Sequence, residues 1–438
     1  MTLRPGGTAT HLLRAALGIG FLMATVPATA QTTAIRFGRL WDGTRVIADV
    51  TVIVEGSKIV SVSTGAAAVP KDATVIDLTR FTGIPGLIDL HTHMTYYWDP
   101  ASGTSPLRQP RREPAATAAL AQANAQRTLE AGVTTVRDLG ASGGADYLMR
   151  DQINAGTMVG PRMFVAGQGI SAGRSGGPNP DAMKQAAEAR VAAGSDWVKV
   201  YASRGSFQSV DTTQTLTFDE MLAIVTAAHA VKHPVAIHSY GASGVRDAVH
   251  AGADSVEHGI DVDDDTLAEM VIRGVVWVPT IDHNRYYIDA KDEYGFKPED
   301  IPPLQNYIQK NLESTTRAVK AGVRIGMGSD AVCSMFGQNT RELGWLVKAG
   351  MTPVEALGAA TTTAAELLGM KDKLGRVAAC RAEYQHRRGA GLLGGATGRC
   401  HGPVHRESRG RFDSRFPDRA RLTESAGAHH TDRSRLLL

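Results

Sequence analysis

An apolar run leads directly into two histidines in the segment Leu87-Ile88-Asp89-Leu90-His91-Thr92-His93. The run predicts a β-strand, and side chains two residues apart in a strand point to the same side. His91 and His93 can therefore direct both imidazoles at one metal ion at the carboxyl end of the strand. A single His-x-His pair also occurs incidentally, so the rest of the chain has to decide between these two interpretations.

From residue 86 to about residue 369, short apolar runs alternate with helical stretches, which is typical of βα units around a parallel sheet. Strands are predicted at residues 87–90, 134–139, 163–166, 197–201, 235–237, 255–257, 275–279 and 323–327. These eight runs favour an α/β fold, specifically a closed (β/α)8 TIM-like barrel over residues 83–370. The alternative is a doubly wound open sheet, but its Gly-rich phosphate loop is missing after the first strand.

Three helix starts can be placed from capping residues. Asn179 stands before a proline, which is the preferred order of an N-cap and a first helical residue. Thr217 with Glu220, and Thr352 with Glu355, have the spacing of capping boxes. These positions support the alternation of strands and helices.

Residues 31–82 predict a small β domain ahead of the barrel. Strands at 49–54 and 58–62 are joined by a short turn as a hairpin, and residues 73–78 form a third strand. We expect a β-sandwich-type domain built mainly from these N-terminal strands. We expect the C-terminal strands that would complete it to be replaced by the atypical tail.

The first 30 residues have the pattern of a secretory signal peptide, with Arg4 and Arg14, an apolar run at 15–26, and Ala28-Thr29-Ala30 as a cleavage site. The run is shorter than the roughly 20 residues of a membrane-spanning helix, which argues against the alternative, a retained anchor. We expect a mature protein that begins near Gln31, is periplasmic or secreted, and has no membrane attachment after removal of the signal.

Residues 371–438 form an atypical Arg-rich tail. Its last 58 residues, 381–438, hold 12 arginines, no lysine and no isoleucine, which excludes ordinary β-strands there. One interpretation is a frameshift near Ala379, because a GC-rich gene that is translated out of frame gives an arginine-rich sequence of this composition. The other is a natural basic interaction tail.

Composition excludes several classes of protein. The 438 residues are 43% hydrophobic and 21% charged, which excludes a disordered, collagen-like or coiled-coil chain. The net charge of +3 is too small to indicate a nucleic-acid partner. Three cysteines cannot form a disulfide framework.

Four further residues stand within or directly after predicted strands. Lys199 lies inside an apolar strand, where a cation is costly to bury, and His238, His258 and Asp330 each follow a strand. Each has an ordinary explanation by itself: an ion-paired lysine, a hydrogen-bonded histidine or a helix-capping aspartate. Together with the His-x-His pair they predict a metal site at the carboxyl ends of the barrel strands, where such folds place their chemistry.

These motifs resemble the metal-dependent amidohydrolase superfamily. The resemblance is to the binuclear branch that contains prolidase-like Xaa-Pro dipeptidases, imidazolonepropionase-like proteins and ochratoxin-hydrolysing amidases. It extends from about residue 34 to residue 378 and is carried by residues 83–93, 196–199, 238–241, 255–259, 328–330, 339–343 and 350–353.

The resemblance implies two divalent metal ions, as a rule Zn²⁺. His91 and His93 would hold one ion with Asp330 as a further ligand, His238 and His258 would hold the second, and Lys199 would be carboxylated and shared. Asp330 would accept a proton from the attacking water and return it to the departing nitrogen. The resulting expectation is a secreted amidohydrolase that uses metal-bound hydroxide to cleave a dipeptide such as Xaa-Pro, an N-acyl amino acid or an ochratoxin-like aryl amide.

Substrate contacts are predicted from residues near these positions. Tyr240 can donate a hydrogen bond to the oxyanion, or it packs at the barrel rim. Arg204 and the segment with His283, Arg285 and Tyr286 can bind a carboxylate or a ring, or they are ordinary surface residues.

Three functions remain open for this sequence. Besides amide hydrolysis, the same centre can open a cyclic amide or imidazolone ring, and a barrel that has lost its chemistry can act as a binding protein. Every expected ligand position is filled, which favours an enzyme. The expected partners are a small-molecule amide or dipeptide substrate and further copies of the chain in a homo-oligomer.

Overall fold

The computed structural model describes residues 31–65, 69–100, 103–106, 109–173, 177–206 and 209–379. The predicted signal peptide at 1–30 and the tail segment 381–438 lie outside the described residues. Among those described, none of the helices combines the length and apolarity that crossing a bilayer requires.

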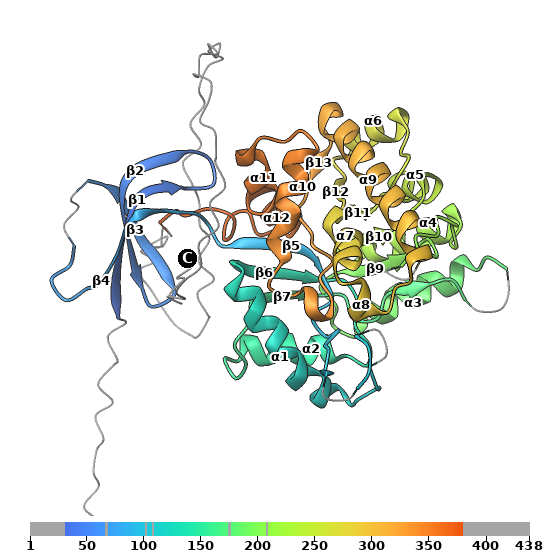
Figure 1. Ribbon diagram of the computed structural model, residues 1–438, viewed down its shortest axis with the longest axis horizontal. Helices are drawn as coiled ribbons and strands as arrows, with labels where there is room; N and C mark the ends of the chain where they lie inside the picture. The colour runs from blue at the N-terminus through green and yellow to red at the C-terminus, as the bar shows by residue number, and fades with distance from the viewer. Residues whose placement is uncertain are drawn as a thin grey trace, which may run out of the picture.

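The N-terminal part is one four-stranded mixed sheet, drawn in blue in Figure 1 to one side of the helical body. Its strands are β1 (Thr32–Trp41), β2 (Val46–Glu55), β3 (Lys58–Thr64) and β4 (Thr74–Gly83), in the order β3-β2-β1-β4. The predicted hairpin is confirmed by antiparallel β2 and β3, and β4 pairs with β1 in parallel.

The expected sandwich is wrong for the described residues, which form a single sheet here. One face of it packs Phe37, Leu40 and Val52 against Val377, whose amide donates to the Asp42 carbonyl oxygen at 3.0 Å. The chain thus returns to this sheet after the main body.

Each of the eight predicted runs of the main body overlaps a parallel strand. The strands are β5 (Leu87–Thr92), β6 (Val133–Asp138), β7 (Arg162–Val165), β9 (Val198–Tyr201), β10 (Val235–His238), β11 (Ser255–Glu257), β12 (Val276–Val278) and β13 (Arg324–Ile325). A ninth strand, β8 (Ile170–Ser171), was not predicted, because two residues carry no periodic signal.

The prediction of a closed barrel is wrong. The strands form a three-stranded sheet, β5-β6-β7, and a six-stranded sheet, β13-β12-β11-β10-β9-β8. Isolated backbone hydrogen bonds cross the two gaps, from Leu90 N to Met327 O at 2.9 Å and from Asp196 N to Val165 O at 2.7 Å. A single parallel bridge between Thr92 and Ala331 also crosses from β5 to the segment after β13, but no continuous ladder joins the two sheets at either gap.

Helices surround these strands in Figure 1. They are α1 (Pro114–Glu130), α2 (Ala145–Asn154), α3 (Pro180–Ala192), α4 (Phe218–Ala230), α5 (Ala242–Ala251), α6 (Asp264–Arg273), α7 (Ile281–Asp289), α8 (Lys291–Tyr294), α9 (Ile301–Ala321), α10 (Glu342–Lys348), α11 (Pro353–Ala359) and α12 (Thr362–Leu367), with short 3-10 turns at Pro298–Asp300, Cys333–Met335 and Asn339–Arg341. The predicted helix starts are confirmed: the Asn179 side chain caps α3, and complete capping boxes at Thr217 and Thr352 begin α4 and α11.

Candidate metal centre

His91 and His93 lie at the carboxyl end of β5, a strand that is buried throughout. His91 Nδ1 donates to Glu257 Oε2 at 2.8 Å, and His93 Nδ1 donates to the Gly140 carbonyl oxygen at 3.0 Å. When Nδ1 carries the proton of a neutral imidazole, Nε2 holds the free lone pair. Both histidines therefore point Nε2 into the site. Burial alone would lower the pKa of His93, but Asp330 raises it, so a metal ion would have to displace a proton from its Nε2.

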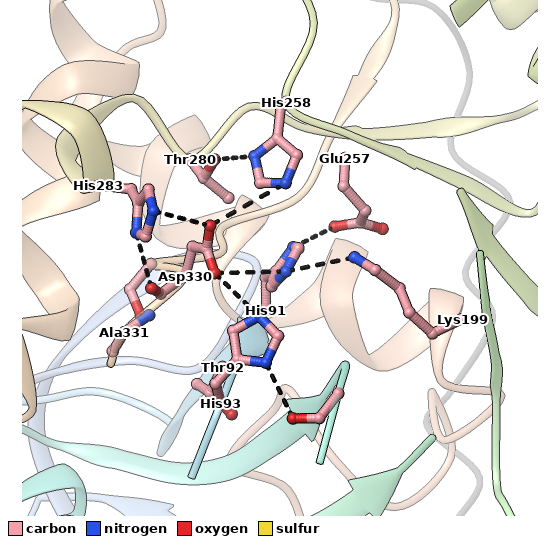
Figure 2. Close-up of polar contacts among 12 residues, drawn as sticks. His91, Thr92, His93, Lys199, Glu257, His258, Thr280, His283, Asp330 and Ala331 are labelled. Carbon is pink, nitrogen blue, oxygen red and sulfur yellow. Dashed lines mark hydrogen bonds and ion pairs between the residues drawn. The ribbon is translucent and has the colours of Figure 1, made fainter. Parts of the chain in front are cut away.

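Asp330 brings a carboxylate into the middle of the histidines, as Figure 2 shows. Its Oδ1 lies 3.2 Å from His93 Nε2 and 3.5 Å from His91 Nε2. The ligand atoms of His91, His93 and Asp330 all lie within 4.8 Å of one another, close enough to hold one ion. Burial alone would raise the pKa of Asp330, but His283 and His91 hold it well below its usual value, so this group is a carboxylate.

Asp330 has a strained backbone, with φ at +52° in the left-handed region. His258 and Thr280 share this feature, with φ at +67° and +50°. Left-handed conformations are unusual for residues with a β-carbon and gather at functional sites. Here all three residues contribute to the same group of side chains (Figure 2).

His238 and His258 form a second pair, from the ends of β10 and β11, with ring centroids 4.5 Å apart. His258 Nδ1 lies 2.7 Å from Thr280 Oγ1, and the ring of His238 hydrogen-bonds the Gly205 backbone. His238 Nε2 is buried and has no hydrogen-bond partner. Burial and neighbouring positive charges hold the pKa of both histidines well below the usual value, which leaves them neutral, as metal ligands must be.

Lys199 on β9 is only 1% exposed, with Nζ 3.5 Å from His91 Nε2. The described residues give it no ion pair. Burial lowers the pKa of Lys199 to about 8. With this pKa the lysine is mostly protonated near neutral pH, but roughly a tenth of it is the neutral amine, far more than for an exposed lysine.

The residues present fit a metal centre. An unpartnered buried nitrogen such as His238 Nε2 costs free energy unless a ligand takes its lone pair. Imidazole and carboxylate donors together suit zinc and similar divalent ions.

A cavity of about 350 Å³ opens over these groups. All six predicted metal ligands line it, together with Tyr240, Arg204 and His283. Tyr96 and Tyr201 also line it and were not predicted. Burial holds the pKa of Tyr240 well above its usual value, so its phenol stays protonated and can donate a hydrogen bond.

Two predicted substrate contacts do not reach this cavity. Arg285 pairs with Asp282 at 3.1 Å and also with Asp289, and Tyr286 donates to Ser334 Oγ at 2.9 Å. The segment that carries them is helix α7. Consecutive residues of a helix point in different directions, so only His283 of the three faces the metal centre.

Sequence reasoning missed Arg137, Glu257 and Thr280. Arg137 Nη2 donates to Glu257 Oε1 at 2.8 Å, with both side chains fully buried. Burial alone would raise the pKa of Glu257, but Arg137 and the hydrogen bond with His91 lower it to about 2. The signal was available, because a charged residue within an apolar strand is what singled out Lys199.

Comparisons with known proteins agree with this geometry. The family model described as "Amidohydrolase family" matches residues 82–381. Ochratoxinase from Aspergillus niger is 28% identical over 320 residues, and the match covers 64% of each chain, so this chain spans a little under two thirds of that relative's length.

Three solved structures are similar to this chain in fold. A Xaa-Pro dipeptidase with bound methionine in its active site is 29% identical, with a TM-score of 0.72 over 81% of this chain and 92% of the other. The structure of A. niger ochratoxinase is 25% identical, with a TM-score of 0.66 over 80% of this chain and 87% of the other. A prolidase complexed with N-methylphosphonate-L-proline is 27% identical, with a TM-score of 0.69 over 80% and 90%.

Proposed function

This chain belongs to the amidohydrolase family, and on that basis we propose that it is a binuclear metal-dependent enzyme that hydrolyses an amide bond in a small molecule. The observation that carries the proposal is the convergence of six buried side chains on one cavity: His91, His93, His238, His258, Lys199 and Asp330. They come from five separate strands or the residues directly after them, and packing alone would not select them for one place.

His91, His93 and Asp330 would hold one divalent ion, and His238 and His258 would hold a second. We propose zinc in both positions, with Lys199 as a carboxylated ligand to both. Three observations support carboxylation of Lys199: its lowered pKa, its near-complete burial and its lack of an ion pair among the described residues. The neutral amine would add to carbon dioxide, forming a nitrogen–carbon bond and releasing one proton to solvent.

When bound, the ions would lower the pKa of a water molecule and polarise the substrate carbonyl. Asp330 Oδ2 would accept the proton that the water gives up and pass it to the departing nitrogen. His283 supports this step: its Nδ1 donates to the Asp330 carbonyl oxygen at 2.8 Å, and its Nε2 lies 3.3 Å from Oδ2, where the two atoms could share one proton. After Asp330 accepts the proton and before it passes the proton on, its Oδ2 could donate a hydrogen bond to His283 Nε2.

The cavity also suggests the class of substrate. Arg204 lines it, is exposed to solvent, and has no ion pair among the described residues, so it could bind a substrate carboxylate. Tyr240 is placed to donate to the oxyanion. We propose an amide that carries a free carboxylate: a dipeptide such as Xaa-Pro, an N-acyl amino acid or an ochratoxin-like aryl amide. The names of the similar proteins support this class.

Metal analysis of the purified protein with a substrate screen tests the proposal. We expect about two equivalents of zinc and hydrolysis of at least one substrate among Xaa-Pro dipeptides, N-acyl amino acids and aryl amides. Activity on cyclic amides or imidazolones alone would support the ring-opening alternative. A protein with no bound metal after growth and reconstitution with zinc would contradict the proposal.

Secretion and self-association are further proposals. The pattern of residues 1–30 supports export to the periplasm or beyond, and amino-terminal sequencing of protein from the cell envelope and medium should give a start near Gln31. Light scattering should give a mass above that of one chain.

A further inference from the structure

Arg137 on β6 is wholly buried and makes contacts along its whole guanidinium group. Its Nε donates to the Leu90 carbonyl oxygen at 2.6 Å, Nη1 to Ser255 Oγ at 2.8 Å and Nη2 to Glu257 Oε1 at 2.8 Å. One face lies over the Trp197 ring, 4.4 Å from its centroid. Since β6 belongs to the three-stranded sheet and β11 to the six-stranded one, Arg137 links the two sheets across the interior between them.

Glu257 continues this contact to the metal centre. Its second oxygen, Oε2, accepts from His91 Nδ1 at 2.8 Å, and Figure 2 shows the contact. Ser255 Oγ donates to Oε1 at 2.5 Å, so both carboxylate oxygens are occupied. Arg137 therefore fixes which oxygen of Glu257 is left for His91.

A buried ion pair such as the one between Arg137 and Glu257 is not explained by folding stability alone. Apolar side chains of similar volume fill such a space without the cost of desolvating two charges. The property that apolar side chains could not supply here is the hydrogen bond to His91. That bond keeps the proton on Nδ1 and directs Nε2 toward Asp330.

We propose that Arg137 is a positioning residue, which acts through Glu257 to fix the tautomer and orientation of His91 and so sets metal affinity. The inference rests on the proposed function, since it assumes that His91 binds a metal ion. It extends the centre by one buried side chain on β6, a strand that supplies no metal ligand.

The orientation of an amide at position 257 gives a sharp test. In the Glu257→Gln variant, Arg137 attracts the amide oxygen, so the NH2 group faces His91 and forces the proton onto Nε2, which cannot then bind metal. In Glu257→Gln with Arg137→Met, the oxygen is free to turn to His91 and restore the correct tautomer. A second substitution should therefore repair the first.

The experiment measures zinc affinity of the apo proteins by chelator competition, with kcat, KM and melting temperature beside it. We expect Glu257→Gln to lose 10- to 100-fold in zinc affinity, the range seen when partners of metal-binding histidines are changed. Its kcat should fall with KM little changed. Adding Arg137→Met should recover at least several-fold in affinity. Arg150→Met is the matched control, because it breaks a partly buried pair with Asp196 away from the centre.

The outcomes separate the two proposals. A double variant that binds zinc no better than Glu257→Gln, or a single variant with wild-type affinity, would overturn the role of Arg137. A wild-type protein that binds no zinc would contradict the proposed function instead. If the glutamine variants do not fold, Arg137→Lys makes the same test: it keeps the charge but cannot make all three hydrogen bonds, and wild-type zinc affinity in that variant would overturn the inference.

Discussion

His283 contacts Asp330 through both of its ring nitrogens. Nδ1 donates to the Asp330 main-chain carbonyl oxygen at 2.8 Å, and Nε2 lies 3.3 Å from the carboxylate Oδ2. The first contact fixes the backbone of Asp330, whose φ is +52°. The second contact is made to Oδ2, the atom that would carry the proton. One side chain thus joins the conformation of Asp330 to its chemistry.

Two substitutions separate these contacts. Asparagine at position 283 can replace the Nδ1 donor but not Nε2, so His283→Asn should keep zinc content and KM while kcat falls about 100-fold, the lower range for loss of help in proton transfer. His283→Gln removes the donor to the main chain and should lower zinc content as well. Steady-state kinetics and metal analysis of both variants check this. Equal kcat in His283→Asn and wild type would refute the role of Nε2.

Replacing Asp330 should separate folding from turnover. Asp330→Ala removes the proton acceptor and one ligand but leaves four histidines and Lys199 in place, so we expect a folded protein that keeps most of its zinc and has no measurable hydrolysis. Circular dichroism, metal analysis and a sensitive product assay test it. Residual activity near that of wild type would show that another group takes the proton.

Arg204 should matter only for substrates with a free carboxylate. A hydrogen bond to a charged group contributes about 1.5–3 kcal/mol, so Arg204→Met should raise KM about tenfold or more for an N-acyl amino acid. The same substrate with its carboxylate amidated should show almost no difference between variant and wild type. A uniform loss on both substrates would mean that Arg204 supports the loop rather than the substrate.

Glu342 should make stability depend on pH. Its two carboxylate oxygens accept from Ile281 N and Asp282 N at the start of α7, at 2.9 and 2.8 Å, and burial raises its pKa to about 8 from 4.5. The folded state then binds more protons than the unfolded state between these values. The stability contributed is complete below about pH 4.5 and is lost as the pH rises toward about 8.

Urea unfolding of wild type and Glu342→Gln between pH 5 and pH 8.5 checks this. The advantage of wild type over the variant should shrink as pH rises, by at most about 1.4 kcal/mol per pH unit. The comparison cancels buried carboxyl groups that do not interact with Glu342, such as Asp138, because they titrate in both proteins. A difference that does not change with pH would contradict the prediction.

Local patterns in the sequence predicted the strands, the helix caps and the residues that converge on the cavity. Strand ends are local features, and the carboxyl ends of parallel strands meet at one edge, so the sequence alone was enough to place His91 near His258. Closure was not predictable, since it depends on how β13 pairs with β5, and two residues of β13 give no signal for this. The direction of Arg285 was not predictable either, because it depends on the segment after β12 being a helix.

Pairing partners were the other limit. Arg137 and Glu257 lie 120 residues apart, and the local sequence around neither residue predicts that the other is its partner. Each could have been noticed as a charge in an apolar strand, but its partner required three-dimensional positions. The same holds for Thr280 and His258, which meet across 22 residues.

Replacing His238 should affect the melting temperature of the metal-free protein and that of the zinc-bound protein differently. In the metal-free protein His238 Nε2 is buried without a partner, and such a group costs about 1–3 kcal/mol. His238→Phe keeps an aromatic ring and removes both that cost and a ligand, but it also removes the hydrogen bond to the Gly205 backbone. The two effects on stability oppose each other, so the metal-free variant should melt close to the temperature of metal-free wild type. With zinc in excess wild type should melt well above the variant, because a ligand at 100 times its Kd adds about 2.7 kcal/mol to the state that binds it. Thermal melts of both proteins, with chelator and with zinc, measure this difference. The same zinc-induced rise in both proteins would mean that His238 is not a ligand.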